Sequence, residues 1–146
     1  MRIAFDLDNT LIPNAFDFET ELPNRKWMAK LFRYEPLRLG TKALFDACHA
    51  KGYETWIYTS SLRSTFYIRK LFWLYDIKLH GIINQMIHDA VVKVGSSKYP
   101  PHFGIDYLID DSKGVQMEGK QYGFKVILVD PSDCCWEKRI LNSLLS

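Results

Sequence analysis

Cysteine is scarce in this chain, and its three copies form no recognisable motif. Cys48, Cys134 and Cys135 include no CxxC pair, which excludes a disulfide framework. For the adjacent Cys134 and Cys135 we expect a role as small buried hydrophobic residues, with a redox or reactive role as the alternative. The four histidines have neither HExxH nor Cys/His ligand spacing, which argues against a zinc site.

Long apolar runs and a large net charge are missing as well. No stretch approaches the roughly 18 consecutive apolar residues of a membrane helix, and the first residues show no signal-peptide pattern. We therefore expect a cytoplasmic protein that does not contact a membrane. A net charge of +2 is too small to indicate nucleic acid as a partner by itself, and it leaves that class of partner open.

The chain does contain what one globular domain requires. Its 146 residues, 47% of them hydrophobic, predict a single domain, 1–146, with a proper core. Apolar runs typical of strands alternate with segments of helical periodicity. The expected strands are 3–7, 53–59, 80–85, 105–111 and 124–130, and the expected helices are 24–35, 41–52, 61–76, 112–123 and 132–145.

This alternation predicts βαβ units with right-handed crossovers. The expected fold is therefore α/β, a Rossmann-like three-layer sandwich around a central, mainly parallel five-stranded sheet with a minimal cap. The cap is a small insertion at about 11–40, where three prolines exclude a long helix. Within it we expect a flap near 16–22 and a short helix with Asn24 as its N-cap.

Two aspartates, Asp6 and Asp8, follow the first expected strand in the segment "AFDLDNT". A buried strand normally excludes carboxylates unless they are paired or bind a metal. Residues i and i+2 of a strand point to the same side, so the two carboxylates are expected to converge. The alternative is a strand that ends in an ordinary turn over 8–10.

Polar residues also follow two later strands. Thr59 and Ser60 come after "WIY", and Asp110 and Asp111 end "YLIDD". Ligands of parallel sheets bind at the carboxyl ends of the strands, so these residues are predicted to meet the first pair of aspartates at one edge. The alternative for each group is that it caps the helix that follows.

A lysine completes this set. Lys98 lies in the loop before the last acidic strand, with Lys93 as the alternative. Four carboxylates, two hydroxyls and one ammonium at one sheet edge are what phosphoryl transfer requires. The carboxylates would hold magnesium, while the hydroxyl and ammonium groups would neutralise phosphoryl oxygens.

Four segments, "DLDNT", "WIYTSS", "SSKYPP" and "YLIDDS", resemble in this order the four motifs of the haloacid dehalogenase-like (HAD) superfamily. The resemblance spans nearly the whole chain, and its first and fourth motifs are the most specific. The dehalogenase and phosphonatase branches of the family lack the second aspartate of "DLD". In having one, this chain resembles the branches that act on phosphate esters. The short 11–40 segment resembles the nearly capless subgroup.

The resemblance implies a magnesium-dependent phosphohydrolase that cleaves a phosphate monoester through an aspartyl phosphate. It implies Asp6 as the nucleophile and Asp8 as the acid and then the base. The implied phosphate-binding residues are Thr59, Ser60 and Lys98, and the implied Mg²⁺ ligands are Asp6, Asp8 through its backbone carbonyl, Asp110 and Asp111.

Other functions fit parts of the pattern. A phosphotransferase would use the same intermediate, and a catalytically silent phosphate-binding or regulatory protein would share the fold. Bacterial receiver domains resemble the chain in using an acidic pair, an acceptor aspartate and a lysine. In receivers the acidic pair comes first along the chain, whereas here it comes last.

The phosphorylated substrate is expected to be larger than a simple sugar phosphate, because so small a cap leaves the site open. Basic and aromatic residues in the cap segment could hold an anionic chain. They are Arg25, Lys26, Trp27, Lys30, Phe32, Arg33, Tyr34, Arg38 and Lys42. The alternative is a solvated basic face whose aromatics pack on the core or on a second copy of the chain, as a homo-oligomer.

Overall fold

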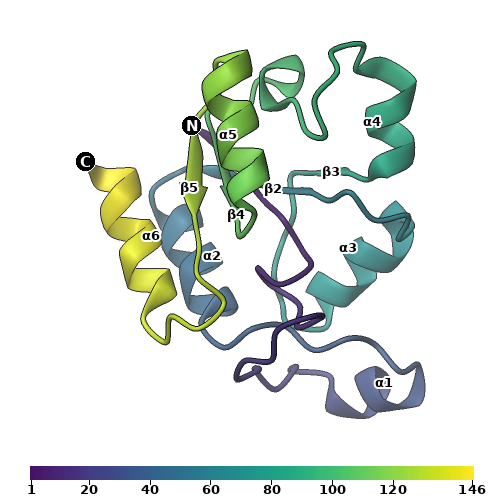
Figure 1. Cartoon of the computed structure of the whole chain (residues 1–146). Coiled ribbons are helices and arrows are strands. Elements are labelled where there is room, and N and C mark those ends of the chain that lie inside the picture. Colours follow the sequence, from purple (N-terminus) through teal and green to yellow (C-terminus); the bar gives the residue numbers. More distant parts are fainter.

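Five parallel strands form the centre of the protein (Figure 1). The computed structural model describes all residues, 1–146. The order across the sheet is β3-β2-β1-β4-β5, and the strands are β1 (Arg2–Phe5), β2 (Glu54–Tyr58), β3 (Gly81–Ile83), β4 (Tyr107–Asp110) and β5 (Val126–Leu128). The carboxyl end of β1 therefore lies between those of β2 and β4, and the predicted five-stranded parallel sheet is confirmed.

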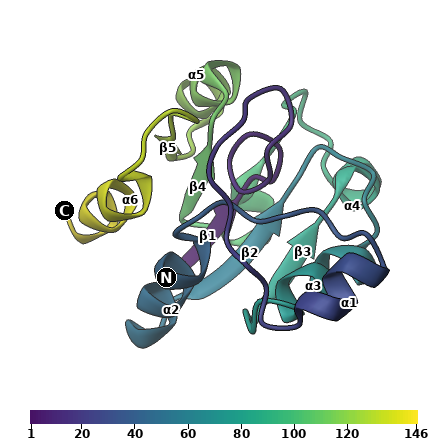
Figure 2. The same cartoon turned by 90° about the horizontal axis from the view of Figure 1, so that it is seen from below.

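Helices cover both faces of this sheet, which makes three layers (Figure 2). One face packs against α2 (Thr41–Ala50), α3 (Thr65–Trp73) and α6 (Trp136–Leu145) through a cluster of 23 buried residues. The other face packs against α4 (Gln85–Val91) and α5 (Lys113–Tyr122) around a cluster of seven. The Rossmann-like sandwich is confirmed.

The strands are apolar throughout because both faces of the sheet are buried. In β1, Ile3 and Phe5 join the larger cluster, and Ala4, which points to the opposite side, joins the smaller one. In β4, Ile109 and Leu108 divide in the same way. This alternation fixes the register of β1 and β4, and with it the direction in which Asp6 and Asp110 leave the sheet.

Three local predictions are wrong. The helix expected over 61–76 begins only at Thr65, because Ser64 is its N-cap and accepts a hydrogen bond from Tyr67 N at 3.0 Å. The chain from 85 to 91 forms α4, a helix of seven residues, where the sequence predicts none. Asn24 does not cap α1, because its side-chain amide donates to Asp76 instead.

The expected buried role of the adjacent cysteines is also wrong. Cys134 and Cys135 are exposed, with their sulfur atoms 3.8 Å apart, and only Cys48 is buried. The two exposed cysteines lie just before α6, in a segment that is held by Asp133 and not by packing of the thiols. None of the helices has the length and apolar character needed to cross a membrane.

Residues 11–40 lie over the carboxyl edge of the sheet as loops and one short helix, α1 (Lys26–Leu31) (Figure 1). The stretch near 16–22 forms no strand, and a single bridge joins Thr20 to Arg38. Arg38 is buried between the rings of Phe18 and Trp136. It also donates to the carbonyl of Thr10 and to carbonyls of the 130–133 loop, and so fastens the segment to the core.

Candidate active site

A tight loop after β1 places the first site residues. Asp6 N donates to Ile109 O at 2.9 Å, which extends the pairing of β1 with β4 by one residue. The carbonyl of Leu7 then accepts hydrogen bonds from the amides of residues 10, 11 and 12. This reversal, with Asn9 at a φ of 61°, returns the chain so that Thr10 lies beside Asp6.

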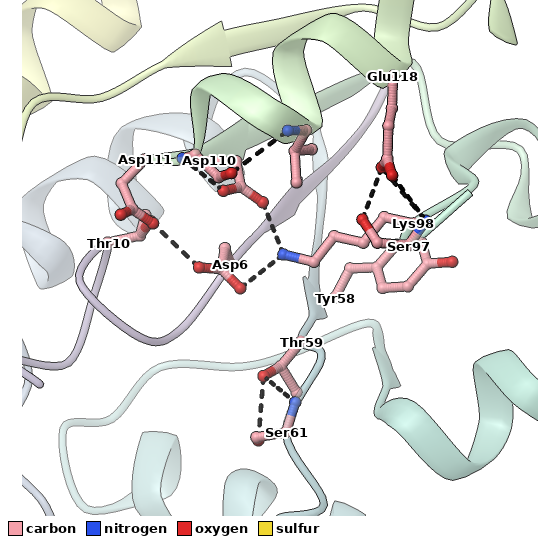
Figure 3. A network of polar contacts seen from close by, with 12 residues as sticks. Asp6, Thr10, Tyr58, Thr59, Ser61, Ser97, Lys98, Asp110, Asp111 and Glu118 are labelled. Carbon is pink, nitrogen blue, oxygen red and sulfur yellow. Dashed lines mark hydrogen bonds and ion pairs between the residues drawn. The ribbon is translucent and has the colours of Figure 1, made fainter. Parts of the chain in front are cut away.

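Lys98 joins the two acidic strand ends. Its Nζ lies 2.6 Å from Asp6 Oδ1 and 2.6 Å from Asp110 Oδ2 (Figure 3). Lys98 is 2% exposed and Asp110 is 1% exposed, so this ammonium is surrounded by protein. Lys93, the alternative from the sequence, is exposed and reaches only the carbonyl of Ala90.

The chain on either side of Lys98 is fixed to different elements. Glu118 of α5 accepts hydrogen bonds from Ser96 Oγ and from both the amide and the hydroxyl of Ser97. On the other side, Tyr99 N donates to the hydroxyl of Tyr58 at 2.9 Å. The position of the ammonium is therefore set by α5 and β2, which are far from Lys98 along the sequence.

The remaining acidic residue, Asp111, completes a group of three carboxylates. Oxygen atoms of Asp6, Asp110 and Asp111 lie within 4.8 Å of one another. Thr10 Oγ1 lies 3.4 Å from Asp6 Oδ2 and 3.2 Å from Asp111 Oδ1, so its hydroxyl joins the two. Asp110 Oδ1 accepts from Ser112 N, and Ser112 itself is the N-cap of α5.

Burial and mutual repulsion act on the pKa values of this group. Burial raises the pKa of Asp6 to about 7, with Lys98 opposing the shift and Asp110 adding to it. Burial and then Asp110 also raise the pKa of Asp111. Burial would lower the pKa of Lys98, but the charges of Asp6 and Asp110 outweigh it, so that pKa is raised.

These residues fit a divalent cation. When all three carboxyl groups are ionised, they and the one ammonium leave two negative charges in one small volume, which one divalent ion balances. The donors are hard oxygen atoms, which Mg²⁺ and Ca²⁺ prefer. Asp6, Asp110 and Asp111 are therefore the side chains that could hold a metal.

Asp8 is not part of this group, although the sequence predicted that the side chains of Asp6 and Asp8 converge. Because β1 ends at Phe5, the alternation of a strand does not extend to Asp8. Its carboxylate accepts two hydrogen bonds from Arg63, at 3.0 and 2.9 Å. The role of its backbone carbonyl as a metal ligand stays a prediction.

Thr59 lies at the same edge of the sheet, but its hydroxyl contacts Ser61 and not the three carboxylates. It is 1% exposed, and its amide donates to Ile83 O. Its hydroxyl donates to Ser61 Oγ at 3.0 Å and accepts from Ser61 N at 3.1 Å, as Figure 3 shows. Ser60 is exposed. Neither residue caps the following helix, since Ser64 does so.

The structure thus brings Asp6, Lys98, Asp110 and Asp111 into contact and holds Asp8 and Thr59 separately. Two further residues, Thr10 and Arg63, contact the predicted site residues directly. The "DNT" turn was a signal for Thr10. No local signal marked Arg63, because its relation to Asp8 exists only in the folded chain.

No protein-family model and no curated protein matches the sequence. Solved structures do match the fold. A HAD-superfamily hydrolase of subfamily IA, variant 1, from Geobacter sulfurreducens PCA is 12% identical with a TM-score of 0.63, and the match covers 98% of this chain and 95% of that one. A predicted HAD-like family hydrolase from Porphyromonas gingivalis is 13% identical with a TM-score of 0.54, covering 99% and 97%.

A third similar structure is a chain of a Pnkp1/Rnl/Hen1 complex. It is 16% identical with a TM-score of 0.55, and the match covers 90% of this chain but only 47% of that one. The present chain therefore spans about half the length of that protein and nearly all of the two hydrolases. The order of its strands and the similarity to the two hydrolases agree, and the chain has the fold of the haloacid dehalogenase-like superfamily.

Proposed function

We propose that the protein is a magnesium-dependent phosphohydrolase that cleaves a phosphate monoester through an aspartyl phosphate on Asp6. One observation above all supports the proposal. A buried ammonium lies between the carboxylates of Asp6 and Asp110, beside a third carboxylate, at the carboxyl edge of a parallel sheet. A carboxylate attacks an anionic phosphate only where nearby cations cancel the repulsion.

The chemistry would proceed in two steps. A carboxylate oxygen of Asp6 attacks phosphorus, and the bond from phosphorus to the leaving oxygen breaks while Asp8, in its protonated form, gives that oxygen a proton and becomes a carboxylate. Asp8 then takes a proton from water, whose oxygen attacks phosphorus and breaks the bond to Asp6. The products are inorganic phosphate, the dephosphorylated alcohol and the original Asp6.

The other residues would neutralise charge. Lys98 is within hydrogen-bond distance of the Asp6 carboxylate and can share its protons with the phosphoryl group that Asp6 attacks. Thr59 would turn its hydroxyl from Ser61 to a phosphoryl oxygen. Mg²⁺ bound by Asp6, Asp110 and Asp111 would supply further positive charge to the nucleophile and the phosphate.

The test is release of 4-nitrophenol from 4-nitrophenyl phosphate by metal-free protein titrated with Mg²⁺. We expect turnover only with the metal and none above background for Asp6→Asn, because an amide cannot form the acyl phosphate. Asp89→Asn is the matched control, since Asp89 is an exposed residue of α4, and it should keep full activity.

Two outcomes would count against the proposal in different ways. Turnover by clean Asp6→Asn protein would show that the mechanism is not covalent at Asp6. Failure of the wild-type protein to hydrolyse any of a panel of phosphorylated metabolites, nucleotides, peptides and nucleic-acid ends would show that it is not a phosphohydrolase.

A further inference from the structure

Arg63 connects the aspartate expected to move protons with the cap segment. Its Nη1 and Nη2 donate to the two oxygens of Asp8 at 3.0 and 2.9 Å. Its Nε and Nη2 donate to the two oxygens of Glu35 at 2.8 and 2.7 Å. One guanidinium is therefore bidentate to two carboxylates that lie 27 positions apart in the sequence.

We propose that Arg63 is the positioning residue for Asp8 and that Glu35 in turn orients Arg63, so that the 11–40 segment completes the catalytic machinery. This inference rests on the proposed phosphohydrolase function, in which Asp8 protonates the leaving group. It adds two residues, neither of which contacts the phosphate-binding and metal-binding group around Asp6.

The geometry of a guanidinium suits this role. Its five N–H donors form a rigid, planar fork, and a bidentate pair fixes the direction of a carboxylate as well as its position. Four of these donor contacts are used here. The Arg63 side chain is 18% exposed and that of Asp8 is 29% exposed, so the pair is shielded enough for its orientation to be defined.

The backbone of Arg63 is held where this requires it. Residues 61–64 precede α3 as a loop, and within it the carbonyl of Arg63 accepts from Asn84 Nδ2 at 3.1 Å. Asn84 also caps α4. The backbone of Arg63 is therefore held by its position before α3 and by Asn84 at the start of α4. Its side chain extends from there to Asp8.

Glu35 is itself held on a second side. It accepts a hydrogen bond from the hydroxyl of Tyr67 at 2.9 Å, and its amide donates back to that hydroxyl at 3.2 Å. Tyr67 stacks on Tyr34 with ring centroids 5.0 Å apart. Hydrogen bonds from Arg63 lower the pKa of Glu35 below its usual value more than any other contact. Glu35 is therefore a carboxylate at neutral pH.

A positioning role predicts dependence on the leaving group. Protonation matters most when the departing oxygen is a poor leaving group, and little when it departs as a stable phenolate. Loss of Arg63 should therefore reduce kcat/KM strongly for alkyl phosphates and weakly for 4-nitrophenyl phosphate. Loss of general folding or of phosphate binding would reduce both to the same extent.

The experiment compares kcat/KM for glycerol 2-phosphate and 4-nitrophenyl phosphate in a set of variants. For Arg63→Gln we expect a loss of about 10- to 100-fold on the alkyl ester, less than the roughly 10²- to 10⁴-fold that the general acid itself contributes, and less than about threefold on the aryl ester. Glu35→Gln and Tyr67→Phe should show smaller losses of the same kind, and Arg63→Lys should recover part of the activity.

A double-variant cycle shows whether Arg63 acts through Asp8. If it does, Asp8→Asn with Arg63→Gln should be no slower on the alkyl ester than Asp8→Asn alone. Arg25→Gln is the matched control, because Arg25 also pairs with a carboxylate, Asp76, away from the site. Thermal unfolding of every variant identifies those that do not fold, and the milder Glu35→Gln and Tyr67→Phe then decide the question.

Equal losses on both esters, or a full further loss when Arg63→Gln is added to Asp8→Asn, would overturn the positioning role while the phosphohydrolase proposal stands. Unchanged kinetics in the folded Arg63→Gln variant would do the same. A wild-type protein without phosphatase activity would instead remove the proposed function, and this inference with it.

Discussion

At the scale of single residues, the charge balance around Lys98 decides what the site can do. Both of its acidic neighbours are almost completely buried, and each lies 2.6 Å from the same nitrogen. Removing one partner of a buried ion pair leaves an uncompensated charge, which is strongly destabilising. Lys98 therefore holds the carboxylates of Asp6 and Asp110 together.

Lys98→Ala should consequently lower both turnover and stability. We expect a loss of about 10²- to 10³-fold in kcat, the usual effect of removing one donor from a transition-state charge. We also expect a lower Tm in metal-free protein that Mg²⁺ partly restores, because the metal replaces the missing cation. Phosphate release and thermal unfolding with and without Mg²⁺ measure these effects.

Lys93→Ala is the control for this prediction, since Lys93 is exposed and far less constrained. It should leave activity and Tm close to those of the wild type. The reverse result, with Lys93 essential and Lys98 dispensable, would show that the wrong lysine has been assigned to the site.

Single residues also show what a sequence can predict of a site. The placement of Asp6 and Asp110 at one edge is predictable because each lies at the end of a strand that its apolar pattern marks. Lys98 lies in a loop, so the sequence offers it only through the resemblance of "SSKYPP" to a known motif, with Lys93 as the alternative. The side-chain direction of Asp8 is not predictable, because the chain leaves the strand at Asp6 and the next turn has its own geometry. The sequence predicts Arg63 in the first turn of a helix over 61–76, but α3 begins at Thr65, two residues after Arg63.

At the scale of elements, α5 shows how closely a helix must approach the sheet. Gly119 lies in the middle of α5, and a Cβ there would come within 2.7 Å of the carbonyl oxygen of Phe124 and 3.0 Å of Val126 Cγ2. The absence of a side chain thus allows α5 to pack on the chain that enters β5. The same helix carries Glu118, which fixes the loop of Lys98.

Two glycines of α5 should therefore respond oppositely to alanine. Gly119→Ala should destabilise the protein by about 1–3 kcal/mol, the usual effect of overpacking, because the backbone carbonyl of Phe124 cannot move away without disturbing the chain that enters β5. Gly114→Ala should stabilise it by about 0.5–1 kcal/mol through helix propensity, since Gly114 is exposed and its nearest contact would be 3.4 Å.

Urea unfolding of the two variants and the wild type measures both free energies. A Gly119→Ala protein as stable as the wild type would mean that α5 can shift away from β5 without loss. If it can, Glu118 and Lys98 are held less firmly than the contacts of α5 indicate.

Elements differ in how far the sequence predicts them. All five strands were predictable because apolar runs bounded by turn residues mark buried parallel strands. Helix α4 is not predictable in this way, because seven residues with one buried side chain, His88, give almost no periodic signal. Its start is fixed instead by Asn84, whose side chain accepts from Ile87 N at 3.0 Å.

At the scale of the whole molecule, two polar systems meet over the carboxyl edge of the sheet. One is built from the core and includes Lys98, which α5 and β2 hold in place. The other is built from the 11–40 segment and reaches the edge through Glu35 and Arg63. The 11–40 segment thus reaches Asp8, one of the predicted site residues, through the contacts of Glu35 with Arg63.

The structure also divides the basic residues of this segment into two groups. Arg25 pairs with Asp76, Arg38 is buried, and Lys42 pairs with Asp46, so these three have structural roles. The exposed members of the segment are Lys26, Lys30 and Arg33, together with the aromatic residues Trp27, at 69% exposure, and Phe32, at 59%. The exposed group is the part that could bind a ligand.

We propose that this exposed group helps to bind an anionic substrate larger than a sugar phosphate. Charge and aromatic stacking together favour a phosphorylated chain, so Lys26→Glu and Arg33→Glu should lower kcat/KM for a 3′- or 5′-phosphorylated oligonucleotide by about tenfold at low salt. The effect should shrink as salt is raised, and kcat/KM for 4-nitrophenyl phosphate should not change.

Lys51→Glu is the control, because Lys51 is exposed at the far end of α2. If the two charge reversals alter neither kcat/KM nor its salt dependence for the best large substrate, the segment has no part in recognition, and its exposed aromatic residues require another explanation, such as contact with a second copy of the chain.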